Sequence, residues 1–310
     1  MWCGYEAMTR FARRYRKVAR GLSRLELMAT PMEESFGDPR ELVTGGSRRF
    51  LDFYGDDGIR MALERYGVFE ALRRRGYDHF ELTTRVAEDQ HTLIIVGAHP
   101  RLSAREHLVE LVVRRDRLVP DVDAGLDGVF DVLTVDWLTL RHPAARFTRQ
   151  RPRLPGQDAP GLGLGEHVAE LLYRVVDRLR FDGLLTVPEY FHNAVIYGRE
   201  LKCFDPAAQG RCDALVAALI GCENLSLAQA SWAIEWGQVY ERGSPIRWRG
   251  EAQLRATCAP LARYLESSAH KEAAEGAARG HHFALDRERF EAKWAEGADT
   301  LEGRVSRSAG

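Results

Sequence analysis

Long hydrophobic runs are missing from this sequence of 310 residues. A helix that crosses a membrane needs about 18–20 consecutive apolar residues, and no stretch approaches that length. The first residues also lack the apolar core of a secretion signal. We therefore expect a cytoplasmic protein without a transmembrane segment.

Cysteine is scarce, and net charge is nearly absent. The five cysteines are odd in number and irregularly spaced, and none forms a Cys-x-x-Cys pair, so the pattern indicates neither a disulfide framework nor a zinc site. The histidines show no ligand spacing, and we predict no metal ion. The formal net charge of -1 gives no overall attraction for polyanions, which argues against a nucleic-acid partner.

What is present is an ordinary globular composition. Apolar residues make up 45% of the chain and charged residues 29%, and a chain of 35.1 kDa can bury a large core. Shifts in composition predict three parts. These are a basic amphipathic helix with a linker at 1–47, a central α/β domain at 48–220, and an extension at 221–310. We expect the extension to pack on the central domain, to be flexible at 273–280 and to end in a disordered tail.

The basic residues of the first part interleave with apolar ones at helical spacing. Such a helix can make a peripheral contact with an anionic membrane or with nucleic acid, or it can pack its apolar stripe on the protein body. The sequence leaves these readings open, and residues 31–47 have the composition of a linker. The residues concerned are Arg10, Arg13, Arg14, Arg16, Lys17, Arg20 and Arg24, with Phe11, Tyr15, Val18 and Leu22 between them.

Apolar periodicity predicts the elements of the central domain. One helix begins at Asp56 or Asp57, continues through Leu72 and ends at Gly76. A second helix carries an apolar stripe from Leu164 onward. The expected strands cover residues 80–86, 93–96, 108–113, 129–140 and 183–187.

Three glycines at alternate positions introduce the second helix. Gly161, Gly163 and Gly165 leave a backbone with few side chains in the way. A glycine-rich turn at a helix N-terminus directs free N–H groups and the positive end of the helix dipole toward one point. The pattern therefore predicts an anion site, most often one for phosphate.

Two common phosphate loops do not fit this turn. The P-loop requires a lysine after the glycines, and none is present. The dinucleotide fingerprint requires a glycine three residues after Gly163, where the chain has Glu166. It also requires a strand that leads into the glycines, whereas residues 151–156 are interrupted by prolines.

A third loop is similar, and with it the chain resembles the GNAT acyltransferases over residues 78–204. In that superfamily a long strand, a loop with Gln/Arg-x-x-Gly-x-Gly/Ala, a helix, a strand and a tyrosine-bearing helix follow one another. The resemblance implies an α/β fold with a mixed central sheet, three strands and a longer fourth, flanked by helices. In this chain Gln157 stands one residue too early, and Asp158 occupies the Gln/Arg position of the loop motif. Asn193 lies closer to Tyr197 than in the family pattern.

The resemblance also implies acetyl-CoA or another acyl-CoA as co-substrate. Its pantetheine arm would lie along the end of the fourth strand, where that strand parts from the fifth, and its diphosphate over the glycines. Arginines in the segment 141–156 either add charge for the phosphates or line an exposed loop. The cofactor-binding residues so implied are Leu138, Leu140, Gln157, Gly161, Leu162, Gly163, Leu164, Gly165 and Asn193.

Acyl transfer from a thioester to an amine needs an acid for the thiolate and a base for the amine. By resemblance Tyr197 is the acid; otherwise it is a core tyrosine with a bonded hydroxyl. Glu189, His192 or Asp136 can be the base. Glu189 follows the end of a strand, and Asp136 lies inside a β-prone run, where a carboxylate needs a partner or a site.

The resemblance thus implies an N-acyltransferase whose acceptor is a small-molecule or protein amine. The acyl length and the carrier, CoA or an acyl carrier protein, stay open. One alternative is a non-catalytic acyl-CoA sensor or scaffold on the same fold, which the departures at Asp158 and near Tyr197 favour. Another is an unrelated α/β protein whose glycine turn is only a tight helix start. A transferase should release free thiol from acetyl-CoA when an amine is present. A sensor should bind acetyl-CoA without turnover, and an unrelated fold should not bind it.

Overall fold

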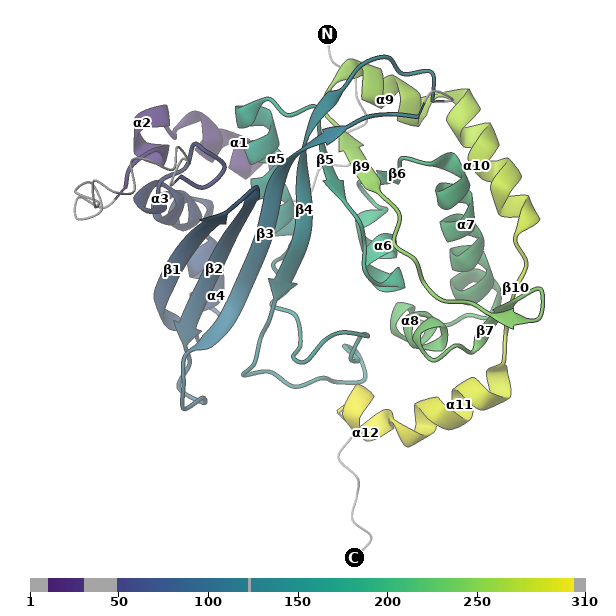
Figure 1. Cartoon of the computed structure of the whole chain (residues 1–310). Coiled ribbons are helices and arrows are strands. Elements are labelled where there is room, and N and C mark those ends of the chain that lie inside the picture. Colours follow the sequence, from purple (N-terminus) through teal and green to yellow (C-terminus); the bar gives the residue numbers. More distant parts are fainter. Residues whose placement is uncertain (1–10, 31–48, 122–123, 304–310) are drawn as a thin grey trace, which may run out of the picture. The chain divides into compact units, whose positions relative to one another are not determined.

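The computed structural model describes residues 11–30, 49–121 and 124–303, and the chain divides into two compact units (Figure 1). The first comprises Met1–Leu118, Phe130–Ala144 and Gly161–Leu184, and the second comprises Val119–Val129, Ala145–Pro160 and Leu185–Gly310. Arg10, the expected linker at 31–47 and the end of the expected tail lie outside the described residues.

The first unit contains the long strands. Among the described residues of this unit, four helices precede the strands, and a fifth helix follows the glycine-rich turn. The elements are α1 (Ala12–Arg20), α2 (Arg24–Leu27), α3 (Asp56–Tyr66), α4 (Val68–Arg73), β1 (Asp78–Ala87), β2 (Gln90–Ala98), β3 (Glu106–Leu118), β4 (Phe130–Leu140) and α5 (Gly165–Leu179).

The second unit is mainly helical. Its first strand, β5 (Gly183–Thr186), begins in the first unit. The remaining elements are α6 (Phe191–Tyr197), β6 (Lys202–Cys203), α7 (Pro206–Val216) with the π-helical turn η4 (Ala217–Cys222), α8 (Leu227–Glu235), β7 (Val239–Glu241), β8 (Ser244–Pro245), β9 (Gln253–Ala256), α9 (Ala259–Glu266), α10 (Ser268–Gly280), β10 (Phe283–Leu285), α11 (Arg287–Glu296) and α12 (Ala298–Leu301).

The protein is a mixed α/β structure with a mostly antiparallel sheet flanked by helices. In the part of the chain that the structure describes, this sheet has seven strands in the order β1-β2-β3-β4-β5-β9-β6. Strands β1 to β4 pair in sequence as antiparallel neighbours. Strands β4 and β5 begin side by side, because the Asp182 amide donates to the Asp131 carbonyl over 2.6 Å, and they run in the same direction.

Helices α1 to α5 bury their apolar sides against one face of β2, β3 and β4. Tyr15 of the basic helix α1 is fully buried, and its hydroxyl lies 2.5 Å from Nδ1 of His167 in α5. Burial raises the pKa of the Tyr15 phenol above its ordinary value. The apolar stripe of the basic helix therefore belongs to the core of the first unit.

Several expected elements need correction. The helix expected from Asp56 to Leu72 is two helices, because Gly67 adopts φ +80° between α3 and α4. Gly55 occupies the N-cap, while Asp56 and Asp57 lie in the first turn of α3. The fourth strand is not the longest, since β3 has 13 residues and β4 has 11.

The C-terminal part is more ordered than the sequence predicts. The expected flexible stretch at 273–280 forms the second half of α10, and the tail after Ala298 begins with α12. Asp205 is the N-cap of α7 and accepts a hydrogen bond from the Ala207 amide over 2.8 Å. A second buried cluster, which includes Leu219 and Phe290, forms the core of this unit.

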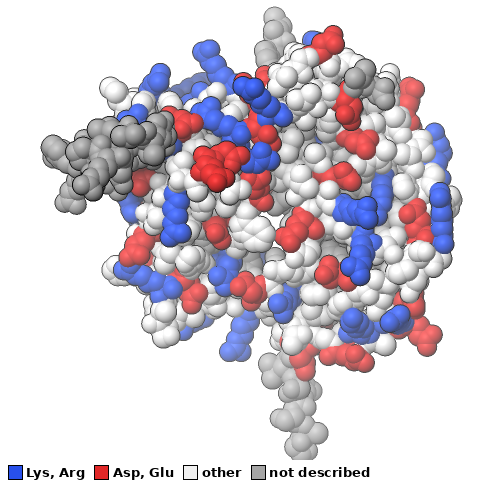
Figure 2. Space-filling model, viewed as in Figure 1, with Lys and Arg blue, Asp and Glu red and all other residues white. Residues whose placement is uncertain are grey.

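Among the described residues no single helix has the length and apolarity to cross a membrane, although the bent pair Pro206–Cys222 and Leu227–Glu235 meets these two criteria together. On the face in view in Figure 2, basic and acidic side chains are interspersed.

Candidate functional site

The glycine-rich turn at 161–165 exposes its backbone on one side. Leu162 and Leu164 are each 1% exposed, whereas the three glycines face solvent. A Cβ added at Gly165 would have no neighbour within 4 Å, and Gly163 has φ +63°, which favours glycine. The leucines therefore anchor the turn, and no side chain of its own covers the outer backbone of the glycines.

Strand β4 holds the start of the turn in place. Gly161 forms an antiparallel bridge with Arg141, and the Leu162 amide donates to the Leu140 carbonyl oxygen over 3.2 Å. Leu138 and Leu140 are half-buried against the core. The pantetheine arm was expected to lie along the backbone at Leu138 to Leu140. The Leu140 carbonyl there already accepts a hydrogen bond from the turn.

Helix α5 begins without a side-chain cap. Leu164 occupies the N-cap, and the first intrahelical bond runs from the Val168 amide to the Leu164 carbonyl over 3.0 Å. The N–H groups of the first turn have no partner within the helix, and the positive end of the helix dipole is located there. An oxyanion over the exposed glycines would meet both.

Arg75 adds a positive charge to the turn. Its guanidinium donates to the Ala71 carbonyl over 2.6 Å and to the Gly163 carbonyl over 3.4 Å. Arg73 and Arg74 instead pair with Glu64 and Glu70 on the surface. These three arginines follow one another at and just beyond the end of α4, and of the three Arg75 is the one that bonds to the turn.

His142 lies in the same positive environment. Its Nδ1 is 2.9 Å from the Tyr77 hydroxyl, which also accepts a hydrogen bond from the Ala144 amide. Burial lowers the pKa of His142, and the positive charges of Arg75 and His99 lower it further. A bound anion would offset this positive potential. Sequence spacing gave no signal for Arg75 or His142 because they are 67 positions apart.

Asp136 is an extra residue in a β-bulge of β4. Val112 pairs with Trp137 and Val113 with Val135, so Asp136 has no opposite residue on β3. Its carboxylate lies 3.2 Å from Nε of Arg114 and also accepts from the Gln90 side chain over 3.4 Å. The carboxylate thus has the partner that its position in a strand requires, and a bulge commonly re-aims backbone groups near a site.

Gln157 belongs to the second unit and stabilises its own turn. Its side-chain oxygen accepts a hydrogen bond from the Leu154 amide over 3.2 Å, and its carbonyl accepts one from Arg153. The Gln157 amide donates back to the Leu154 carbonyl. Its side-chain oxygen is therefore committed to local structure.

Glu189 and His192 flank a common neighbour, Tyr190, in the second unit. The Tyr190 and His192 rings stack with centroids 5.5 Å apart, and burial together with the Glu189 charge raises the pKa of Tyr190. His192 is 3% exposed, and burial lowers its pKa to about 4. Its Nδ1 has no hydrogen-bond partner among the described residues. His192 is therefore a neutral imidazole near pH 7.

Tyr197 and Asn193 lie on the same short helix, α6. Burial raises the pKa of Tyr197, so its phenol keeps its proton across the neutral range. Asn193 is half-buried in the first turn of α6, and its amide donates to the Tyr190 carbonyl. The phenol thus has a proton to donate, although the raised pKa makes it a weaker acid than an exposed tyrosine.

A polar cavity of about 230 Å³ borders α6 within the second unit. Its walls include Arg211 and Arg249 as well as Asp205 and Glu251. The buried Gln253 side chain also lines it, and Oε1 of this residue has no partner within the described part of the chain. The cavity offers both charge signs and an acceptor that needs an N–H group.

Comparison with known protein families finds no family model that matches this chain, and comparison with curated proteins finds no similar sequence. In the described ranges, no group of three or more histidine, cysteine or acidic side chains has the arrangement to hold a metal ion.

Proposed function

We propose that the protein binds an acyl thioester such as acetyl-CoA and transfers the acyl group to an amine, on a GNAT-like fold. The observation that carries the proposal is the exposed backbone of residues 161–165 at the uncapped start of α5. A diphosphate there would accept N–H hydrogen bonds and interact favourably with the helix dipole and with Arg75.

The order of elements supports this proposal. Four antiparallel strands, a glycine-rich turn, α5, β5 and α6 follow one another as the resemblance implies. Strand β4 begins parallel to β5 and carries the bulge at Asp136. A bulge interrupts regular pairing and turns backbone groups out of the ladder, where a thioester carbonyl can use them.

The proposed reaction is a direct transfer. The amine lone pair attacks the thioester carbonyl carbon, the carbon–sulfur bond breaks, and its electron pair leaves with the sulfur. Tyr197 would protonate the thiolate, because its buried phenol carries a proton at neutral pH. Glu189 is the better candidate for the amine proton, since Asp136 pairs with Arg114 and His192 is buried.

The acceptor is proposed to be a small polar amine. The cavity beside α6 combines arginines with carboxylates, and the unpartnered oxygen of Gln253 can accept a hydrogen bond from an ammonium group. A molecule with one ammonium and one carboxylate group matches these walls. A panel of amino acids and small diamines therefore comes before protein lysines as acceptors to assay.

Binding is tested first, by the thermal unfolding of the protein with and without CoA. At a concentration one hundred times the dissociation constant, a ligand of the folded state adds about 2.7 kcal/mol to its stability. Turnover is tested next, by the release of free thiol from acetyl-CoA with each amine of the panel. Stabilisation with amine-dependent thiol release supports the transferase.

The other outcomes identify the alternatives. Stabilisation by CoA without turnover of any acyl-CoA with any amine would favour the acyl-CoA sensor on the same fold. No stabilisation by CoA, acetyl-CoA or a longer acyl-CoA would refute the proposal. The turn would then be only a tight helix start.

A further inference from the structure

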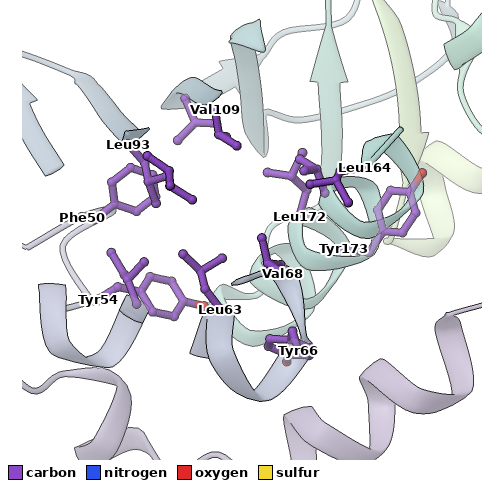
Figure 3. Close-up of a cluster of buried hydrophobic side chains, with 14 of the residues drawn as sticks. Phe50, Tyr54, Leu63, Tyr66, Val68, Leu93, Val109, Leu164, Leu172 and Tyr173 are labelled. Atoms are coloured by element: carbon purple, nitrogen blue, oxygen red, sulfur yellow. The ribbon is translucent and has the colours of Figure 1, made fainter. Parts of the chain in front are cut away.

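The core of the first unit contains a partly open apolar cavity of about 120 Å³. Side chains from helices and strands surround an open centre, as Figure 3 shows for Phe50, Leu63, Leu93, Val109, Leu164 and Leu172. Protein interiors are close-packed, and voids larger than a water molecule cost stability. A cavity of this size amid large side chains therefore calls for an occupant.

The cavity adjoins the proposed thioester site on two sides. Leu164, which stands between the exposed glycines 163 and 165, puts its buried side chain into the wall. Val113, on another wall, pairs with Val135 directly beside the β4 bulge. One wall thus lies beneath the proposed diphosphate site, and the other lies next to the bulge where the thioester carbonyl would bind.

The N-terminal helices provide a further wall. Leu22, just before α2, and Leu27, the last residue of α2, are buried and line the cavity. Arg178 of α5 holds this segment by donating to the Ala19 carbonyl over 2.8 Å and to the Leu22 carbonyl over 3.3 Å. The basic N-terminal segment therefore helps to set the size of the cavity.

We infer that this cavity receives the hydrocarbon part of the acyl group, so that the preferred donor carries a short- to medium-chain acyl group instead of acetyl. The inference rests on the proposed function. A designed cavity of about 150 Å³ holds benzene, so about 120 Å³ suits about four to six carbons. The walls offer apolar contact almost throughout, which an acetyl group would leave largely unused.

The test measures the affinity of the full-length protein for free CoA and for acetyl-, butanoyl-, hexanoyl-, octanoyl- and dodecanoyl-CoA by calorimetry, without an amine. Each buried methylene is expected to tighten binding about fourfold, up to the capacity of the cavity. The affinity should therefore rise to hexanoyl-CoA and then fall.

Two variants and a control locate the effect. Val109→Phe narrows the cavity and should remove the gain from acetyl to hexanoyl, with free CoA bound as before. Leu63→Ala enlarges it and should move the optimum to a longer chain, which keeps the test decisive if Val109→Phe fails to fold. Leu219→Ala removes a buried side chain from the core of the second unit and should leave the profile unchanged.

The failures are distinguishable. CoA binding with equal affinity for every thioester would overturn the acyl cavity and leave the proposed function standing. An optimum that neither cavity variant moves would likewise overturn it. Absence of binding by CoA and all its thioesters would overturn the proposed function and this inference together.

Discussion

Replacing Gly165 with alanine is expected to stabilise the free protein and weaken CoA binding. A methyl group there has no neighbour within 4 Å, and the backbone is not in the left-handed region. Glycine-to-alanine changes at such positions add about 0.4–1 kcal/mol, mainly by restricting the unfolded chain. The same methyl group would keep a diphosphate away from the N–H groups at the start of α5.

The loss of binding follows from the hydrogen bonds at stake. A hydrogen bond to a charged group contributes about 1.5–3 kcal/mol, so losing one would weaken CoA binding about tenfold to a hundredfold. The assay pairs urea unfolding of the free protein with calorimetric titration of CoA.

Gly276→Ala is the matched control. It adds a methyl group at an exposed position inside α10, where the nearest atom is the flexible end of Arg279 at 3.8 Å. It should raise stability without changing CoA affinity. If Gly165→Ala bound CoA as tightly as the original protein, the turn would not be the diphosphate site.

Three further changes test other parts of the account. His192 has a depressed pKa of about 4, so its stabilising contribution is complete above pH 6.5 and is lost as the pH falls toward 4, by about 3 kcal/mol. Urea unfolding at pH 7 and pH 4.5 gives the free energy of unfolding that is lost on acidification, and this loss should be smaller for His192→Gln than for the original protein. An equal loss in the two proteins would contradict the assigned pKa of His192. Tyr197→Phe should reduce thiol release about a hundredfold or more while acetyl-CoA still binds, whereas unchanged release would exclude Tyr197 as the acid. Arg75→Ala should weaken CoA binding about tenfold, whereas Arg74→Ala, which removes only a surface ion pair with Glu70, should not; equal effects would remove the special role of Arg75.

Local periodicity was enough to predict the sheet of the first unit. Alternating or continuous apolar residues marked each of β1 to β5, although they underestimated the lengths of β2 and β3. Arg114 and Asp116 form a half-buried ion pair over 2.7 Å, and these two charges interrupt the apolar pattern beyond Val113. A single helix across Gly67 was wrong because its apolar stripe continues through α4 while the backbone turns.

The second unit was harder to predict because its elements depend on tertiary contacts. The stretch 273–280 consists largely of small residues that suggest flexibility, yet Gly210 of α7 lies so close to the Ala274 carbonyl that a Cβ would be 2.2 Å from it. Small residues there permit close helix packing. Such a reason for small residues cannot be read from one segment alone.

The glycine turn was predictable, but its surroundings were not. The alternation of glycine and leucine gives both the exposed backbone and the buried anchors, and each follows from the residue type. Arg75 and His142 approach through the fold, and Gln157 turns its side-chain oxygen to Leu154. The apolar cavity joins five separate chain segments and has no local sequence pattern.

The most direct measurement is a CoA titration of protein labelled with ¹⁵N only at glycine, followed by NMR. The amide signals of Gly163 and Gly165 should shift in a saturable manner, while that of Gly276 stays in place; the signal lost in Gly165→Ala assigns one of them. Saturable CoA binding that leaves both turn glycines unshifted, or no binding, would contradict the claim that this turn receives the diphosphate.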